Sequence, residues 1–450
     1  MKDINIFIFR RDLRFEDNTS LNSLISLELP ILPIFIFNKN QIEPEKNAYF
    51  SNNCVQFMIE SLKEIPISYY ESDDDIKILM KLNKEYNIKS IGFNKDYTPF
   101  AIKRDNIIKE WCDKNNINLI SEEDYTLFPI EFIKNNSNKP YEVFTAFYNK
   151  CLSTHKSKPI KKPITLKGKF IKSSNKLNID KYYNKNINIA VNGGRSKALL
   201  ILDKIKKGNL KNYNKTRDIP SIEGTTRLSA YIKFGCVSIR ECFYCFSDPK
   251  NPIIRKLFWR EFYANITYNF PRILKGKSFR EKYDKLDWSY NKNEFNKWCN
   301  GQTGFPIVDA GMRQLNETGW MHNRLRMITA MFLTKDLFID WKLGEKYFAS
   351  KLVDYDPSSN NGGWQWCSST GTDSQPYFRI FNPWLQAKKY DKDCIYIKKW
   401  LPELKDIPNK DILNWDKSYI KYKDVYYEPI IDHSIESKKT IKKFKNIINK

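Results

Sequence analysis

Three short segments of the chain combine residue types that could bind a ligand or take part in chemistry. The first, residues 223–229, places two threonines, an arginine and a serine where the pattern predicts the start of a helix. Free backbone N–H groups, the helix dipole and the hydroxyls could together hold a phosphate there. Thr and Ser also cap many ordinary helices, so this segment alone is only weak evidence for an anion site.

The second segment, residues 320–327, contains Arg324 and Arg326. Side chains two positions apart on a helix point to different faces. One arginine could therefore meet an internal carboxylate while the other faces solvent or a ligand. His322 in the same segment is equally well explained as a packed polar residue.

The third segment, residues 354–366, brings two acids, three amides, two glycines and two tryptophans into thirteen positions. Glycine lets a backbone approach a flat ligand closely. Carboxylates and amides offer directed hydrogen bonds, and tryptophan offers a π surface. This composition indicates a binding site rather than a plain helix.

Cysteine and histidine usage argues against several other kinds of site. The nine cysteines form a single CxxC, Cys242 to Cys245, in an apolar, helix-like stretch, which favours core thiols over zinc. Three histidines in the whole chain argue against a His-based metal site or a Ser-His-Asp hydrolase. We therefore expect no metal and a reducing, intracellular location, in cytoplasm or nucleus. There is no apolar run of about 18 residues and no secretory signal pattern, so we expect no membrane partner.

The elements that must position these segments differ between the two halves of the chain. Five β-rich runs separated by helical stretches predict a parallel α/β sheet within residues 1–130; they cover residues 4–9, 31–37, 67–70, 90–93 and 118–120. Among the helical stretches are residues 52–63 and 75–86. From residue 196 to 450 the pattern is helical, with a long stretch over 307–341 that breaks near Gly319.

A basic connector separates the two halves, and we place it at residues 131–195. Residues 151–190 hold ten lysines and one acid among prolines, which indicates a solvated, loop-like linker. Ten of the eleven tryptophans lie between positions 259 and 415, so the helical half has a different task from the first half.

The net charge of +24, from 76 Lys and Arg against 52 Asp and Glu, has two explanations of similar weight. It could attract a polyanionic partner. It could also express an AT-rich genome as surface lysine, because only 16 of the 76 basic residues are arginine.

The three segments resemble the cryptochrome/photolyase family, most closely the class I cyclobutane pyrimidine dimer photolyases. Residues 10–14, 258–261, 303–310 and 377–383 continue the match in order along nearly the whole chain. The resemblance implies a Rossmann-like α/β domain, a large helical FAD domain, and light-driven repair of pyrimidine dimers in UV-damaged DNA by a monomeric enzyme.

For FAD, the resemblance implies that one group of residues holds the phosphates: Tyr213, Thr225, Thr226, Arg227, Leu228 and Ser229. It implies that Arg260 lines the pocket, that Asp354 and Asp356 bind the flavin, and that Arg326 pairs with Asp354. A buried arginine there favours the anionic reduced flavin. Asn360 would face flavin N5, where an amide is typical of photolyases and plant cryptochromes usually carry Asp.

For DNA, the resemblance implies a lesion pocket with Trp259 and Trp366 as walls and Asn323 and Met327 against the flipped bases. It implies contacts to the DNA backbone for Arg217, Arg324 and Arg379, with Arg324 the outward partner of Arg326. Lys256 departs from the family, which has Glu or Gln there. We expect it to make a supporting DNA contact, since lysine donates hydrogen bonds but cannot accept them.

Three tryptophans match the electron-transfer relay of the family, with Trp364 nearest the flavin, Trp341 in the middle and Trp288 at the surface. A second, antenna chromophore would lie near residues 94–100. Phe100 and Ala101 replace the Asn-Glu pair of folate-binding relatives, which argues against folate and leaves a deazaflavin, a second flavin or none.

Three other functions compete with this one. A cryptochrome photoreceptor is the main alternative, and Asn360 and the lesion-pocket residues stand against it. In (6-4) photolyases a His-His pair usually replaces His322-Asn323. A flavin redox enzyme would need a nicotinamide site, and no GxGxxG opens a helix after a strand.

Overall fold

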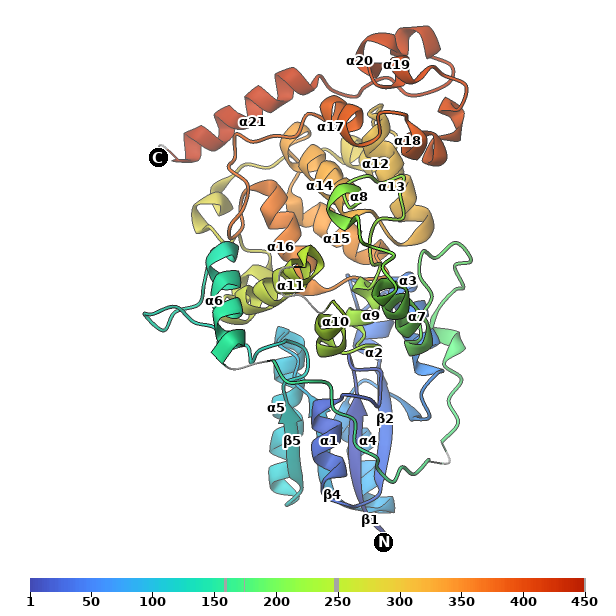
Figure 1. Ribbon diagram of the computed structural model, residues 1–450, viewed down its shortest axis with the longest axis vertical. Coiled ribbons are helices and arrows are strands. Elements are labelled where there is room, and N and C mark those ends of the chain that lie inside the picture. Colours follow the sequence, from blue (N-terminus) through green and yellow to red (C-terminus); the bar gives the residue numbers. More distant parts are fainter. Residues whose placement is uncertain (158–159, 174, 247–250, 449–450) are drawn as a thin grey trace.

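The computed structural model describes residues 1–157, 160–173, 175–246 and 251–448. Its N-terminal part is a five-stranded parallel sheet in the order β3-β2-β1-β4-β5, at the bottom of Figure 1. The strands are β1 (Asp3–Phe9), β2 (Ile31–Asn38), β3 (Ser68–Ser72), β4 (Asn87–Asn94) and β5 (Asn118–Glu122). The predicted α/β sheet is confirmed, and all five β-rich runs overlap a strand.

Alternation of side chains along β1 divides the sheet into two cores. Ile4, Ile6 and Ile8 pack with α4 (Asp75–Glu85) and α5 (Pro99–Lys114) on one face. Phe7 and Phe9 point the other way, toward α1 (Thr19–Ile25) and α3 (Asn52–Leu62). Successive side chains of a strand point to opposite faces, so a continuous apolar run fits a strand that is covered on both sides.

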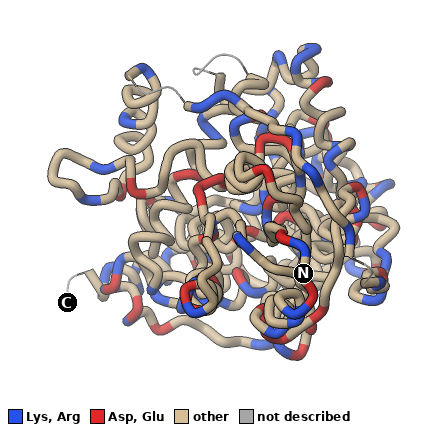
Figure 2. The backbone as a smooth tube through the Cα atoms, turned by 90° about the horizontal axis from the view of Figure 1, so that it is seen from below, with Lys and Arg blue, Asp and Glu red and all other residues tan. Residues whose placement is uncertain are grey.

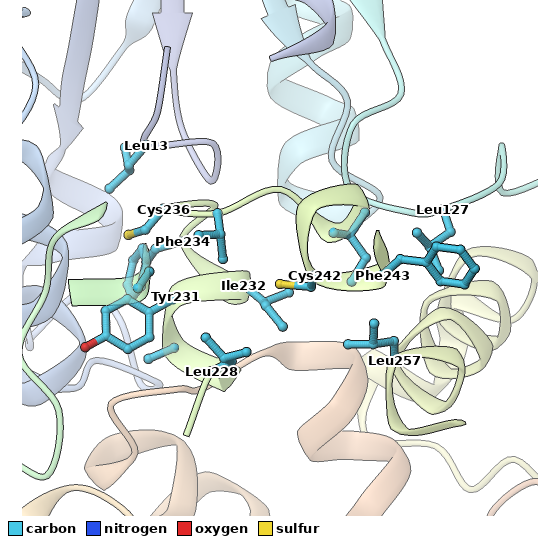
Figure 3. Close-up of a cluster of buried hydrophobic side chains, with 14 of the residues drawn as sticks. Leu13, Leu127, Leu228, Tyr231, Ile232, Phe234, Cys236, Cys242, Phe243 and Leu257 are labelled. Atoms are coloured by element: carbon cyan, nitrogen blue, oxygen red, sulfur yellow. The ribbon is translucent and has the colours of Figure 1, made fainter. Parts of the chain in front are cut away.

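The core on the Phe7 side continues into the helical half of the chain. Figure 3 shows Leu13 and Leu127, which follow β1 and β5, in one cluster with Leu228, Ile232 and Phe243. The two halves therefore share a hydrophobic core, although each has its own architecture.

The helical half confirms the second part of the predicted fold class. Its helices are α7 (Arg195–Lys206), α8 (Tyr213–Thr216), α9 (Ser229–Lys233), α10 (Ile239–Cys245), α11 (Pro252–Asn269), α12 (Lys292–Asn300), α13 (Pro306–Thr318), α14 (Asn323–Met331), α15 (Trp341–Lys351), α16 (Pro357–Ser368), α17 (Pro383–Tyr390), α18 (Ile395–Trp400), α19 (Asn409–Ile412), α20 (Trp415–Ser418) and α21 (His433–Ile448). The predicted break at Gly319 is present, with this glycine in the left-handed region at φ +67°. A second break follows the π-helical turn Phe332–Asp336, and Asp340 then caps α15.

Beyond a helix that ends at Ser157, most described residues of the predicted loop-like stretch 151–190 are exposed and lie outside helices and strands. This helix, α6 (Phe144–Ser157), fills the first part of the connector. Further along, Lys169 and Ile171 exchange backbone hydrogen bonds with Ile31 at the start of β2, at 2.8 and 2.9 Å. The lysine-rich composition correctly indicates exposure, although it does not reveal this backbone pairing.

A buried ion-pair network joins the two halves. Asp124, just after β5, accepts hydrogen bonds from Arg14 at 2.6 Å and from Arg240 of α10 at 2.7 Å. Arg240 also reaches Asp17 at 2.9 Å. Burial acts to raise the pKa of Asp124, but the two guanidinium groups hold it well below its usual range.

Charge is spread over the molecule rather than gathered on one face. Figure 2 shows Lys and Arg positions all around the outline, interleaved with Asp and Glu. Among the described residues, no helix has the length and apolar character needed to cross a membrane.

Candidate active site

A cavity of about 490 Å³ lies in the helical half, between α9, α11, α14 and α16. Most of the residues singled out in the sequence line it: Tyr213, Thr226, Leu228, Ser229, Lys256, Trp259, Arg260, Asn323, Arg326, Met327, Asp354, Asp356, Asn360, Trp364 and Trp366. Residues more than 150 positions apart in the chain therefore meet around one space.

One end of the cavity is built around Asp354, which follows α15. Its carboxylate accepts hydrogen bonds from the Arg326 guanidinium at 2.9 and 3.1 Å and from the Ser229 hydroxyl at 2.6 Å. Arg326 also donates to the backbone carbonyl of Met321 at 2.9 Å. The expected ion pair between Arg326 and Asp354 is therefore present. The same carboxylate binds Ser229, the first residue of α9.

The other acid, Asp356, is held by the α/β domain. Its carboxylate binds the guanidinium of Arg11 and accepts a hydrogen bond from the Tyr125 hydroxyl at 2.7 Å. The guanidinium of Arg260 stacks 3.6 Å from the centre of the Tyr125 ring. Burial acts to raise the pKa of Asp356, but Arg11 and Arg260 hold it well below its usual range, so this cavity wall stays anionic.

Arg11 and Tyr125 are functional neighbours that the sequence reasoning did not assign to the site. Arg11 lies in the motif at residues 10–14, but nothing in its local pattern points to a carboxylate 345 positions away. Tyr125 stands in no motif noted above. The contact between the domains therefore helps to set the charge of the cavity.

Helix α16 presents its glycines in two different ways. A Cβ added to Gly362 would lie 2.2 Å from the Tyr263 ring, so this glycine makes room for a side chain. A Cβ added to Gly363 would meet no atom within 4 Å, and Gly363 lines the cavity. Only Gly363 therefore leaves free space for a flat ligand, as the composition of this segment predicts.

Aromatic rings form the wall toward α6. Trp259 and Trp366 both line the cavity, and Trp259 stacks on Phe144 with ring centres 3.8 Å apart. Lys256 stands exposed at the rim. Desolvation by the surrounding walls, together with Arg217 and Arg324, lowers the pKa of Lys256.

Comparison with known families accounts for both halves of the chain. Residues 5–164 match the DNA photolyase model, and residues 253–446 match the FAD binding domain of DNA photolyase. The chain belongs to the DNA photolyase family.

Relatives and solved structures agree with this membership of the photolyase family. The chain is 37% identical to the deoxyribodipyrimidine photo-lyase of Alkalihalophilus pseudofirmus, over 97% of each protein. It is 34% identical to the same-named protein of Escherichia coli, over 94% of this chain and 95% of that one. A crystal structure of an archaeal photolyase from Sulfolobus tokodaii superimposes with a TM-score of 0.88 at 38% identity, covering 99% and 100% of the two chains.

Several residues that photolyase resemblance assigns to the site lie outside the cavity. Thr225 is not among the lining residues. Arg227 pairs with Glu223 at 2.5 Å, and its guanidinium stacks over Trp320 at 4.6 Å. Arg217 is half-buried and lies 3.8 Å from Asp218, and Arg379 is exposed.

The expectation that Arg324 faces outward is wrong. Its guanidinium donates to Asp218 at 2.8 Å and stacks 4.2 Å from the centre of the Tyr390 ring. The side chain is 14% exposed, against 27% for Arg326. Helical spacing separates the two arginines correctly, but Asp218, just after α8, and Tyr390 of α17 cover Arg324.

The three tryptophans expected to form an electron relay are all buried, so the expectation that Trp288 lies at the surface is wrong. Trp364 packs edge-on to Phe348, and Gly344 of α15 leaves room for its ring. Trp341 begins α15. Trp288 is 7% exposed because Phe338 stacks on it and Phe444 of α21 covers its edge. Trp298, missed above, lies 6.1 Å from Trp364.

Proposed function

We propose that the chain is a deoxyribodipyrimidine photo-lyase, a carbon–carbon lyase that uses light to split cyclobutane pyrimidine dimers in DNA. One observation supports this most. A single cavity combines the Arg326–Asp354 ion pair, the amide of Asn360 and the aromatic walls Trp259 and Trp366. Curated relatives with this name cover nearly the whole chain. We further propose that the protein is intracellular and acts as a monomer, with domains at residues 1–130 and 196–450 joined by 131–195.

The cavity fits FAD. Gly363 leaves open space beside the polar wall, and the ion pair and Ser229 offer donors and acceptors. When bound, FAD would supply the light absorption and the single electron that enters the dimer. Tyr213, Thr226, Leu228 and Ser229 would hold its phosphate end, and Arg260, Asp354, Asp356 and Asn360 its flavin and ribityl groups. Arg260 and Arg326 line the cavity, and a guanidinium beside the flavin favours its anionic reduced form.

The same cavity would hold the flipped dimer. Photolyases take the damaged bases out of the duplex, because a dimer inside the stack cannot reach the flavin. Trp259 and Trp366 would stack against the flipped bases, with Asn323 and Met327 beside them. One electron added to the dimer breaks the two bonds of the cyclobutane ring that join the bases, and the electron then returns.

A hydrogen bond to the adjacent helix fixes the side chain of Asn360. Its side-chain amide donates to the backbone carbonyl of Glu345 in α15 at 3.1 Å. The amide oxygen is thereby left for the cavity. This residue supports repair over the cryptochrome alternative.

Buried tryptophans would return the flavin to its reduced state. Trp364, in the cavity wall, would donate an electron toward the flavin. Trp341 would then reduce the oxidised Trp364, and Trp288 would reduce the oxidised Trp341. The three rings lie in one apolar core. Each transfer would move the positive charge to a ring further from the flavin, which delays its recombination with the flavin electron.

A second cavity supports an antenna chromophore. It measures about 250 Å³ and lies at the carboxyl ends of β1 and β2, lined by Phe37, Tyr49 and Phe50 together with Arg10 and Asp96. Ligands of open α/β sheets bind at this edge, where the strand order reverses between β1 and β4. The Sulfolobus tokodaii photolyase is described with two FAD molecules. We propose a flavin or deazaflavin here, to be identified by absorption spectra of the chromophores released on denaturation.

The repair assignment is tested by illumination of the reduced, FAD-loaded protein with thymine-dimer DNA, with chromatography of the released bases. Thymine monomers are expected in light and not in darkness. Retained FAD without monomers would favour a cryptochrome photoreceptor. Repair confined to (6-4) photoproducts, offered in a parallel reaction, would favour that enzyme instead.

A further inference from the structure

The burial of Trp288 leaves the proposed relay without an exposed end. Phe338 stacks on its ring at 4.7 Å, and Phe444 of α21 lies 6.3 Å away. A positive charge that reached Trp288 would therefore be shielded from soluble reductants. The inference below rests on the proposed function, because it extends the relay of that site.

Tyr290 follows Trp288 on the same backbone segment. Ser289, between them, forms a parallel bridge with Ile339 and donates to the carbonyl of Phe338 at 2.8 Å. In an extended segment, residues two apart lie on one face with their Cα atoms roughly 6–7 Å apart. Tyr290 is 63% exposed, so it places an oxidisable side chain in contact with solvent two positions from the buried Trp288.

The Tyr290 hydroxyl has a proton acceptor in place. It donates to Asp340 Oδ2 at 2.8 Å. Asp340 is buried, and its other oxygen accepts the backbone N–H of Lys342 at 3.0 Å as the cap of α15. Lys342 Nζ lies 3.0 Å from the same Oδ2. Asp340 directly precedes Trp341, so the acceptor is anchored beside the middle of the relay.

We propose that Tyr290 is the terminal electron donor of the relay and that Asp340 takes its proton. The oxidised Trp288 ring gains one electron and becomes neutral. Tyr290 loses that electron, and its phenolic proton moves to Asp340 Oδ2. The products are Trp288, a neutral tyrosyl radical and a protonated Asp340. A soluble thiol can then give a hydrogen atom to the phenoxyl oxygen, after which Asp340 releases its proton to water.

The proton acceptor is needed because a phenol that loses an electron becomes a strong acid. The hydrogen bond to Asp340, followed by desolvation and the nearby Asp287, raises the pKa of Tyr290 to about 12. Tyr290 therefore starts as a protonated phenol at neutral pH. Loss of its electron and loss of its proton must occur together, and the hydrogen bond makes this possible.

Two other tyrosines near Trp288 lack such an acceptor. Tyr283 is buried against Phe444, and Tyr377 stacks on the same ring with centres 5.7 Å apart. In the part of the chain that the structure describes, neither hydroxyl donates to a carboxylate. Tyr377→Phe is therefore a matched control, which removes a nearby phenol without removing a proton acceptor.

The test is flash photolysis of the FAD-loaded protein with its flavin oxidised, followed by transient absorption and by electron paramagnetic resonance of frozen samples. In the unchanged protein and in Tyr377→Phe, a tryptophanyl signal should decay as a tyrosyl signal rises. Tyr290→Phe should lose the tyrosyl signal and lengthen the life of the tryptophanyl one. Asp340→Asn should slow tyrosyl formation roughly 10²-fold, the lower range for a lost general base. Asn caps a helix as well as Asp, so α15 keeps its start.

Three results would overturn the proposal. A tyrosyl signal that persists in Tyr290→Phe, or that disappears only in Tyr377→Phe, would place the donor elsewhere. A tryptophanyl signal that decays equally fast in Tyr290→Phe and the unchanged protein would remove Tyr290 from the path while leaving the relay intact. Absence of any tryptophanyl signal in the unchanged protein would remove the relay itself, and the donor with it.

Discussion

At the scale of single residues, Lys256 is the main departure from the family pattern. It stands exposed at the cavity rim, near Arg217 and Arg324. Both arginines lie close to Asp218, at 3.8 and 2.8 Å, whereas Lys256 has no ion pair among the described residues. An unpaired cation beside the proposed lesion pocket is free to meet a DNA phosphate.

Replacing Lys256 with Gln should weaken binding to dimer-containing DNA and lower its dependence on salt. Each phosphate contact contributes about 0.9 to the slope of log affinity against log salt concentration, so the slope should fall by about that amount. Titrations over a series of salt concentrations measure it. Lys77→Gln removes the same charge from α4 and should leave the slope unchanged. An unaltered slope in Lys256→Gln would refute the phosphate contact.

At the scale of elements, two glycines of the neighbouring helices α15 and α16 have opposite roles. Gly344 of α15 faces the Trp364 ring, and an added Cβ there would lie 2.2 Å from the ring. Gly363 of α16 faces open space at the cavity wall. One glycine serves packing between the helices, and the other serves the space for a ligand.

Gly363→Ala and Gly344→Ala should therefore have different effects. Gly363→Ala should keep or raise stability, because Ala favours a helix interior over Gly by about 1 kcal/mol, yet it should weaken FAD binding. Gly344→Ala should lower the free energy of unfolding by about 1–3 kcal/mol through overpacking. Urea unfolding and flavin fluorescence titration separate the two. Unchanged FAD affinity in Gly363→Ala would mean that this wall does not touch the cofactor.

At the scale of the whole molecule, buried charges join the α/β and helical halves. Arg14 and Arg240 share Asp124 in the interface, and Arg11 reaches across to Asp356 in the cavity. The halves also share one hydrophobic core. The α/β domain therefore supports the active site as well as the second cavity.

Asp124→Asn should destabilise the whole protein. It leaves the buried Arg14 without its anion and Arg240 with Asp17 alone, and breaking a buried ion pair from one side costs about 3–5 kcal/mol. The control Asp73→Asn breaks an exposed pair with Lys77, which is worth about 0–1 kcal/mol. Denaturant unfolding compares them. A loss as small as that of the control would show that Asp124 is dispensable to the interface.

The strands, the break at Gly319 and the family could all be predicted from the amino-acid sequence. These features are local. A β-rich run, a helix-breaking glycine or a motif of fixed spacing can be recognised from a few consecutive positions. The motifs also predicted most of the cavity wall, because α11, α14 and α16 each bring several of their residues to the same space.

Which charges pair and which rings are covered depends on the tertiary structure. Arg324 faces Asp218 from a position 106 residues away, and Asp356 is held by Arg11 across 345 residues. Trp288 is buried because α21, near the end of the chain, folds back over it. Burial and ion pairing depend on whatever the fold brings alongside a side chain, and neighbours so distant in sequence leave no local pattern.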